Sequence, residues 1–225
     1  MKLLVLALNY ILLTTSLSKW IDRIMTYCNT VKSSVHYYNE HADTFIYTTQ
    51  QVDMSNLYQQ LTPLLPVGAS ILDAGCGSGR DALNFKNMGF DVEAFDASKA
   101  MSEAASQLIG QNVHCCTFME FNSQRSFDAI WACASLLHVP HKKLPETFEH
   151  LAQFLSNEGK FTVSFKYGDS ERQEGERHFT DMNEVRFEQV IRDAGCLSVG
   201  KTWLTSDNRP QNETKWFNSI LYKFG

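Results

Sequence analysis

The chain has 225 residues, of which 44% are hydrophobic and 20% are charged, enough to bury the core of one globular domain. Its formal net charge of −5 provides no overall attraction to a phosphate backbone, so nucleic acid is a disfavoured partner. The six cysteines form no CxxC pair and show no zinc-ligand spacing, which favours a reduced, cytoplasmic protein without a bound metal.

The N-terminal segment has the layout of a secretory signal. Lys2 precedes an apolar run from Leu3 to Leu13, and Ser16-Leu-Ser18 follows. This run is too short to span a membrane. We interpret residues 1–24 as an extension ahead of a start at Met25 and residues 25–225 as the functional domain; the alternative is a true export or tethering signal.

The rest of the chain alternates strand-like and helix-like segments, which is typical of a parallel sheet covered by helices. Strands are expected at 70–73, 90–95, 113–118, 127–133 and 160–167. Helices are expected at 51–61, 80–88, 98–108, 144–155 and 183–194. Two final strands, 196–204 and 215–223, have no helix between them and must be antiparallel. These elements predict an α/β fold with a Rossmann-like seven-stranded sheet, mostly parallel, with an antiparallel terminal hairpin and helices on both faces.

Three alternating glycines follow the first strand, in Asp73-Ala-Gly75-Cys76-Gly77-Ser-Gly79. Without Cβ atoms this backbone can turn tightly and lie against a ligand, with N–H groups of the helix start facing it. The spacing differs from the G-x-G-x-x-G of dinucleotide enzymes. A carboxylate at Asp73 would repel a pyrophosphate but suits a ligand with an ammonium group. S-adenosylmethionine has that ammonium group and no phosphate.

Asp96 ends the second strand, about 20 residues beyond the glycine turn, where an acidic side chain can accept hydrogen bonds from both ribose hydroxyls. Taken alone, an aspartate after a strand is more often a turn or cap residue. Any adenosine cofactor would suit it. A nicotinamide-dependent oxidoreductase is therefore one alternative, which the glycine spacing and Asp73 disfavour, and a non-catalytic S-adenosylmethionine-binding protein is another.

Three stretches resemble successive motifs of class I S-adenosylmethionine-dependent methyltransferases: Leu72 to Ala82, Ala94 to Ser98 and Phe127 to Trp131. The similarity runs from about Tyr37 to Lys223, so residues 25–225 are expected to form the methyltransferase domain. The sequence also resembles the tellurite-resistance-type small-molecule methyltransferases in Gly79-Arg-Asp81, Ala134-Ser-Leu-Leu-His-Val-Pro140, Ser164-Phe-Lys-Tyr-Gly168 and Trp216-Phe-Asn218.

The resemblance implies a set of cofactor-binding residues: Tyr38, Asp73, Gly75, Cys76, Gly77, Gly79, Asp96, Ala97, Met101, Phe118, Met119 and Trp131. It places the glycine turn along the methionine moiety, Asp73 near its ammonium group and Asp96 at the ribose. Met101 would flank the adenine, and Phe118-Met119 would contact the base edge. Related families often have an aspartate there, and Glu120 is a possible substitute. The helix that begins at Tyr37 resembles one that closes over the cofactor; Tyr38 would touch the cofactor or simply pack this helix on the sheet.

The segment from Trp131 to His138 should form the floor near the transferable methyl group. His138 is a candidate general base, and a packing or cap residue in the alternative. The expected substrate-binding residues are Ser135, Lys166, Tyr167 and Arg177.

Four cations, Lys166, Arg172, Arg177 and Arg209, fall in loops on the expected substrate side and suggest an anionic substrate. In the alternative, Arg172 and Arg177 pair with neighbouring glutamates on a solvated loop, namely Glu171, Glu174 and Glu176. No Asn-Pro-Pro-Tyr tetrapeptide of amino-methylating DNA enzymes is present, so a small molecule is favoured over nucleic acid. The expected reaction is in-line methyl transfer, for which alignment and exclusion of water suffice. An RNA- or protein-directed methyltransferase remains an alternative, and the sequence does not indicate an oligomeric state.

Overall fold

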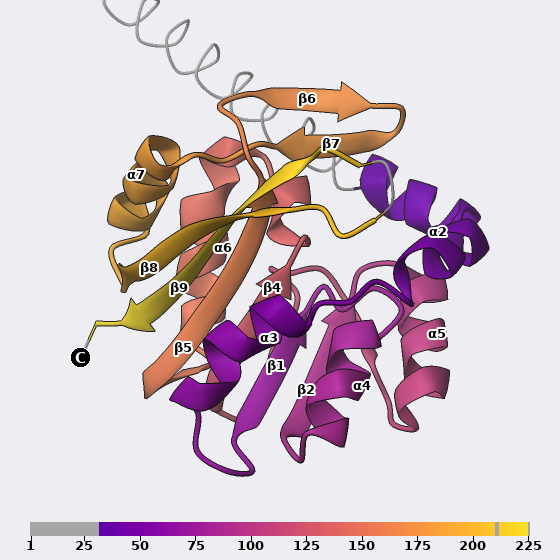
Figure 1. Cartoon of the computed structure of the whole chain (residues 1–225), viewed down its shortest axis with the longest axis horizontal. Helices are drawn as coiled ribbons and strands as arrows, with labels where there is room; N and C mark the ends of the chain where they lie inside the picture. Colours follow the sequence, from indigo (N-terminus) through magenta and orange to yellow (C-terminus); the bar gives the residue numbers. More distant parts are fainter. Residues whose placement is uncertain (1–31, 210–211, 225) are drawn as a thin grey trace, which may run out of the picture.

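The computed structural model describes residues 32–209 and 212–224 (Figure 1). The signal-like segment and the start proposed at Met25 lie outside these residues. No helix within the described ranges is long and apolar enough to cross a membrane.

A seven-stranded sheet forms the centre of the molecule, in the order β3-β2-β1-β4-β5-β9-β8. Its strands are β1 (Ser70–Ala74), β2 (Asp91–Asp96), β3 (His114–Cys115), β4 (Phe127–Cys133), β5 (Leu155–Lys166), β8 (Leu197–Ser206) and β9 (Lys215–Lys223). The first five are parallel, and β9 lies antiparallel between β5 and β8. This confirms the predicted mostly parallel sheet with an antiparallel terminal hairpin. The strand order reverses beside β1, and ligands of open α/β sheets bind at the carboxyl ends of the strands at such a point.

Helices cover both faces of the sheet, as predicted (Figure 1). They are α2 (Ala42–Thr49), α3 (Ser55–Leu61), α4 (Arg80–Asn87), α5 (Lys99–Ile109), α6 (Leu144–Ala152) and α7 (Glu184–Ala194), with short 3₁₀ turns η1 (Thr62–Leu64), η2 (Leu136–His138) and η3 (His141–Lys143). Residues 32–40 are also helical. Consecutive strand residues point to opposite faces, so Ile71 packs in the cluster beneath α3, α4 and α5, and Leu72 in the cluster beneath α6 and α7. Both strand faces are buried, which explains the apolar runs in the sequence.

Three elements are clearly shorter than predicted. The helix expected at 51–61 begins at Ser55, and the helix expected at 144–155 ends at Ala152 because β5 begins at Leu155. Strand β3 covers only His114–Cys115 instead of 113–118. There the Glu120 carboxylate accepts hydrogen bonds from the backbone N–H and the hydroxyl of Thr117, at 3.0 and 2.9 Å, which turns the chain away from the sheet edge.

A small hairpin, β6 (Glu171–Glu174) and β7 (Arg177–Thr180), was not expected from the sequence. Its residues are mostly polar and lack the apolar alternation by which a half-buried strand is recognised. The register pairs Glu174 with Arg177, and the two-residue turn between them contains Gly175 with a φ of 59°. The hairpin lies apart from the main sheet, near the helix of residues 32–40, where Ser34 Oγ accepts the His178 N–H at 3.1 Å.

Candidate cofactor and acceptor site

The glycine turn between β1 and α4 leaves no room for a side chain at Gly75. Gly75 has a φ of 75°, and a Cβ on it would come within 2.5 Å of Ser135 Cβ and 3.3 Å of Phe118 Cζ. The backbone N–H groups of Gly75 and Cys76 donate to the Phe95 carbonyl at 2.9 and 3.0 Å, tying the turn to β2. The positive φ and the close packing against Ser135 and Phe118 therefore both require glycine at position 75.

Two cavities meet at this turn, a larger one of about 500 Å³ and a smaller one of about 120 Å³. Six residues line both: Tyr38, Phe45, Gly75, Gly77, Ala134 and His138. Of the other predicted cofactor residues, the smaller cavity contains Asp96, Ala97, Met101 and Phe118, and the larger one contains Asp73 and Cys76. The structure thus brings most of the predicted cofactor residues into one continuous space.

Asp96 is fixed in the smaller cavity by two backbone donors. Its Oδ2 accepts the Gly77 N–H and its Oδ1 the Ser98 N–H, both at 2.8 Å. Burial raises the pKa of this carboxyl, and the two hydrogen bonds act in the opposite direction. Asp96 therefore both shapes the glycine turn and presents its oxygens where the ribose is expected.

Asp73 and Asp81 are both buried but have opposite electrostatic roles. Asp81 accepts hydrogen bonds from Tyr58 Oη at 2.7 Å, Trp131 Nε1 at 2.8 Å and Arg80 Nε at 2.7 Å. Burial acts to raise the pKa of Asp81, but Arg80 and these donors outweigh it and keep the pKa low. Asp73 Oδ2, by contrast, is buried without a hydrogen-bond partner among the described residues. Burial and the nearby Asp81 charge raise the pKa of Asp73 well above its usual range.

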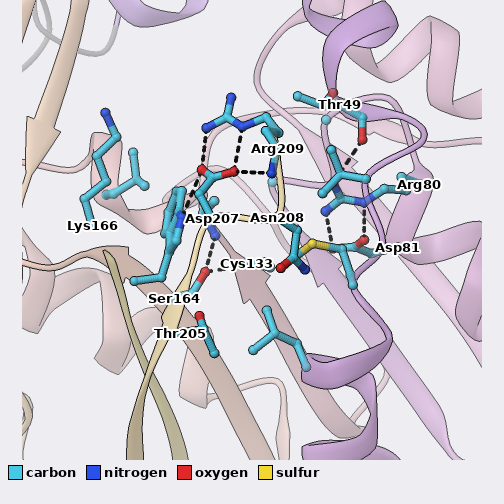
Figure 2. A pocket seen from close by; sticks show the side chains of 18 of the residues that line it. Thr49, Arg80, Asp81, Cys133, Ser164, Lys166, Thr205, Asp207, Asn208 and Arg209 are labelled. Atoms are coloured by element: carbon cyan, nitrogen blue, oxygen red, sulfur yellow. Dashed lines mark hydrogen bonds and ion pairs between the residues drawn. The ribbon is translucent and has the colours of Figure 1, made fainter. Parts of the chain in front are cut away.

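An ammonium group beside Asp73 would satisfy the unpartnered oxygen and favour the ionised carboxyl. The residues present therefore fit the methionine end of S-adenosylmethionine. Arg80 also lines the larger cavity, and its Nη1 donates to the Thr49 carbonyl at 3.2 Å. In the sequence, Gly79-Arg-Asp81 contributed only to a family resemblance, and the buried ion pair between Arg80 and Asp81 was not predicted (Figure 2).

Tyr38 and His138 form a hydrogen-bonded pair where the two cavities meet. His138 Nδ1 lies 2.7 Å from the His178 carbonyl and can only donate to it, so Nε2 accepts the Tyr38 hydroxyl at 2.9 Å. Burial lowers the pKa of His138 to about 4, and burial raises the pKa of Tyr38 to about 12. In this arrangement His138, the predicted general base, is neutral, and the lone pair on its Nε2 already accepts a hydrogen bond from Tyr38. This favours the packing alternative over catalysis.

This protonation state predicts a pH effect on stability. Between about pH 6.5 and pH 4 the unfolded histidine binds a proton and the folded one does not, so the wild-type protein loses stability as pH falls through this window. His138→Gln, which has an amide donor and acceptor but no titration, should give a flatter curve of unfolding free energy against pH. Urea unfolding at several pH values measures both curves, and other titrating groups cancel in their difference. Parallel curves would show that His138 is not held neutral.

Four predicted site residues lie outside the two cavities, and a fifth, Ser135, lines only the smaller one. Gly79, with a φ of 85°, allows α4 and α5 to approach, since a Cβ there would lie 3.0 Å from Ala105 Cβ. Trp131 is fully buried and supports Asp81 rather than the cavity floor. Met119 lies in the turn that Glu120 stabilises, and Tyr167 is 41% exposed with its hydroxyl 3.3 Å from Glu184. Ser135 lines only the smaller cavity, and its hydroxyl donates to the Ala74 carbonyl at 2.7 Å, so the structure does not place it at the acceptor end.

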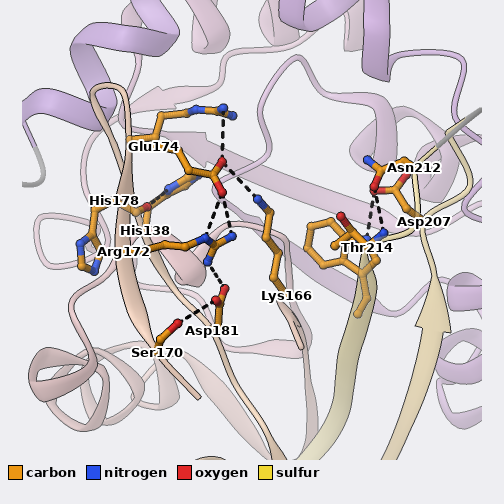
Figure 3. A network of polar contacts seen from close by, with 12 residues as sticks. His138, Lys166, Ser170, Arg172, Glu174, His178, Asp181, Asp207, Asn212 and Thr214 are labelled. Atoms are coloured by element: carbon orange, nitrogen blue, oxygen red, sulfur yellow. Dashed lines mark hydrogen bonds and ion pairs between the residues drawn. The ribbon is translucent and has the colours of Figure 1, made fainter. Parts of the chain in front are cut away.

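The cationic residues divide into two groups. Lys166 and Arg177 line the larger cavity, whereas Arg172 lines neither cavity and pairs with Glu174 and Asp181 (Figure 3). Glu174 also contacts Lys166 at 3.5 Å and Arg177 at 3.9 Å. The pairing expected in the alternative thus holds for Arg172 and, at a longer distance, for Arg177, although Arg177 and Lys166 also line the larger cavity.

Arg209 also lines the larger cavity but is neutralised locally. Its guanidinium forms a two-point contact with the Asp207 carboxylate, at 2.9 and 2.6 Å, and Trp216 Nε1 donates to the same carboxylate at 3.1 Å (Figure 2). Lys166 and Arg177, which contact Glu174 at 3.5 and 3.9 Å, are therefore less tightly paired than Arg209.

The comparisons with known proteins agree with this geometry. The family model described as a methyltransferase domain matches residues 47–195, so the chain belongs to this family of enzymes. The chain is a methyltransferase with the class I, Rossmann-like fold, which confirms the predicted family, fold and enzyme class and does not support an oxidoreductase. No curated protein matches the chain.

Solved structures of similar fold include other methyltransferases, two of which contain S-adenosylhomocysteine. One is a 1,6-didemethyltoxoflavin N1-methyltransferase from Burkholderia thailandensis with bound 1,6-didemethyltoxoflavin and S-adenosylhomocysteine; it is 20% identical with a TM-score of 0.73, covering 89% of this chain and 90% of that one. A magnesium protoporphyrin IX methyltransferase from Synechocystis PCC 6803 with bound S-adenosylhomocysteine is 17% identical (TM-score 0.65, coverage 84% and 97%). A TehB-like S-adenosylmethionine-dependent methyltransferase from Corynebacterium glutamicum is 18% identical (TM-score 0.66, coverage 82% and 98%).

Proposed function

We propose that this protein transfers a methyl group from S-adenosylmethionine to a small anionic molecule. The observation that carries the proposal is the continuous space around the glycine turn. Its smaller part is lined by Asp96, Met101 and Phe118, and its larger part extends from Asp73 to the cations Lys166 and Arg177. A nucleoside with a charged amino acid tail suits the first part and the turn, which leaves the cationic end for a second molecule.

Each end of this space has groups that suit one part of the cofactor. Asp96 would accept hydrogen bonds from the ribose, Met101 and Phe118 would contact the adenine, and Asp73 would pair with the ammonium group. When bound, S-adenosylmethionine supplies a methyl group that is already electrophilic because it is attached to a positively charged sulfur. Two solved structures of similar fold contain S-adenosylhomocysteine, which supports the same cofactor here.

The residues of this chain would contribute orientation and exclusion of water. Tyr38 and Phe45, from the helices of residues 32–40 and α2, lie over the point where the cavities meet and limit access of solvent. Lys166 and Arg177 would hold the anionic group of the acceptor and so direct the rest of the molecule towards the glycine turn. A strong general base is not needed for this in-line transfer, which agrees with the neutral, engaged state of His138. A cytoplasmic location is proposed with this function, since the cofactor is a cytosolic metabolite.

The anion site is supported by its charges and its unpaired donor. Lys166 Nζ lies 3.8 Å from the centre of the Phe179 ring, and Arg177 lies 4.5 Å over the Tyr37 ring, so aromatic faces hold both cations in place. Arg177 Nε is buried and has no hydrogen-bond partner in the part of the chain that is described. A carboxylate on the acceptor would satisfy this donor.

The test measures S-adenosylhomocysteine release with a panel of small carboxylic acids and their matched primary amides. We expect turnover of at least one acid, with kcat/KM about a hundredfold above that of its amide, because a lost charged hydrogen bond costs about 1.5–3 kcal/mol. Arg177→Gln should bring the acid to the level of the amide. Glu174→Gln should raise kcat/KM for the acid, since this carboxylate competes for both cations.

Arg125→Gln is the matched control, because Arg125 is half-exposed and pairs with Asp91 and Glu93 on β2, outside both cavities. It should leave the preference for the acid intact. Equal turnover of acids and amides would refute the anionic acceptor. Failure to bind S-adenosylhomocysteine would refute methyl transfer itself.

A further inference from the structure

The larger cavity extends across the sheet in the order of the strands. From the glycine turn it passes the end of β4 at Cys133, then Ser164 and Lys166 on β5, and then Trp216 and Asn218 on β9. The sheet register places Asn218 between Ser164 on β5 and Trp203 on β8. Thr205 and Ser206 on β8 border the cavity beyond β9, so Asn218 is a polar lining residue on a buried strand three strands away from β1 and its glycine turn.

Asn218 is an unusual residue for this position. It is 1% exposed, and Phe217, Ile220 and Leu221 around it on β9 are equally buried apolar residues. A buried side-chain amide costs free energy unless both its donor and its acceptor are satisfied. Packing alone would be served better by an apolar residue of the same size.

Only the donor half of the Asn218 amide is satisfied. Nδ2 lies 3.1 Å from Thr205 Oγ1, 3.2 Å from the Trp216 carbonyl and 3.3 Å from the Trp203 carbonyl. Two of these partners can only accept, so this atom must be the NH₂ group, and the orientation of the amide follows. Oδ1 is buried and has no hydrogen-bond partner among residues 32–209 and 212–224.

A second unsatisfied group among the residues that line the same cavity has the opposite character. Arg177 Nε is a donor without a partner, and Asn218 Oδ1 is an acceptor without one. Both residues line the same cavity but come from different elements, β7 and β9. One molecule with an acceptor and a donor at separate positions would satisfy both.

We propose that Asn218 Oδ1 accepts a hydrogen bond from the methyl acceptor, which is therefore a small anion that also carries an N–H or O–H group. The inference rests on the proposed function and deepens it. Asn218 acts as a specificity-determining residue: it selects among anions those with a donor group at a distance from the charge. The class includes hydroxylated and amino-substituted aromatic carboxylates.

The test compares matched ligands on the wild-type protein loaded with S-adenosylhomocysteine. Hydroxy- and aminobenzoates, and the same compounds with the hydroxyl or amine fully methylated, are titrated and followed by ligand-observed NMR. We expect the donor-bearing compounds to bind at least about tenfold more tightly, since leaving a buried acceptor unpaired costs about 1–3 kcal/mol. Equal binding of donor-bearing and methylated compounds would overturn the inference. If both kinds of acid still bind more tightly than their matched amides, the anion site would remain supported.

Two variants complete the test. Asn218→Leu should bind both compounds of each pair equally well, and a thermal melt shows whether it remains folded; the wild-type comparison decides the question if it does not. Ser219→Ala is the matched control, because Ser219 Oγ is also a buried group without a partner in the described ranges, on the next residue of β9, but Ser219 does not line either cavity. It should retain the wild-type preference.

If Asn218→Leu changes the melting temperature and not the preference, Oδ1 serves the fold alone and the inference is wrong. If no member of the panel binds even at millimolar concentration, both this inference and the small-anion proposal fail, whereas cofactor binding would still be measurable.

Discussion

Asp81→Ala is expected to lower the free energy of unfolding by about 3–5 kcal/mol, the usual cost of removing one partner from a buried ion pair. The carboxylate of Asp81 is the common acceptor for Arg80, Tyr58 and Trp131. Its removal leaves the Arg80 guanidinium without its counter-ion and two aromatic donors unsatisfied in the core. Urea denaturation followed by tryptophan fluorescence and circular dichroism measures the change.

Asp91→Ala is the control for this prediction. Asp91 also pairs with an arginine, Arg125, but its side chain is 61% exposed, so its loss should cost less than about 1 kcal/mol. A similar small loss for Asp81→Ala would show that the buried network around Arg80 does not support the fold. A large loss would show that the hydrogen bonds of Asp81 with Arg80, Tyr58 and Trp131 stabilise the fold.

Asp96→Ala is expected to weaken S-adenosylhomocysteine binding by at least about a hundredfold while the far-ultraviolet circular dichroism spectrum stays unchanged. Two effects add here. The ribose would lose a charged hydrogen-bond acceptor, and the Gly77 and Ser98 N–H groups, which Asp96 binds at 2.8 Å, would lose the group that holds the glycine turn in place. Isothermal titration calorimetry measures the affinity.

Glu93→Ala provides a control on the same strand. Glu93 contacts His114 and Arg125, both at 3.4 Å, and lies outside the two cavities, so its removal should leave the affinity unchanged. If Asp96→Ala bound the cofactor as tightly as the wild type, the ribose would have to be placed elsewhere.

Much of the fold was predictable from local pattern. The apolar strands, the caps at Ser98 and Asn183 and the glycines that end α5 and α7 are local signals, because strand and helix periodicity and capping act within a few residues. The glycine turn and Asp96 could be located for the same reason: each follows a strand in the chain. The β6–β7 hairpin escaped prediction since its charged residues are stabilised by partners on other elements, such as the contact of Glu174 with Lys166.

The chemistry of individual side chains depended on the tertiary structure. Asp73 and Asp81 are the same residue type eight positions apart, yet Asp81 accepts hydrogen bonds from distant Tyr58 and Trp131, and Asp73 retains an unpaired oxygen. In the same way, the Tyr38 hydroxyl and the His178 carbonyl, brought in from separate elements, engage both ring nitrogens of His138.

The sequence by itself therefore determined the class of fold and the position of the glycine turn, because these follow from short-range periodicity and spacing, and it indicated the family of enzyme through the resemblance of its motifs. Lys166 and Arg177 were expected from the sequence and line the larger cavity, but only the tertiary structure added Asn218 to that lining and decided which polar groups are left unsatisfied. The physical reason is that hydrogen bonding and burial in a folded core depend on neighbours far apart in the chain, and no local pattern records them.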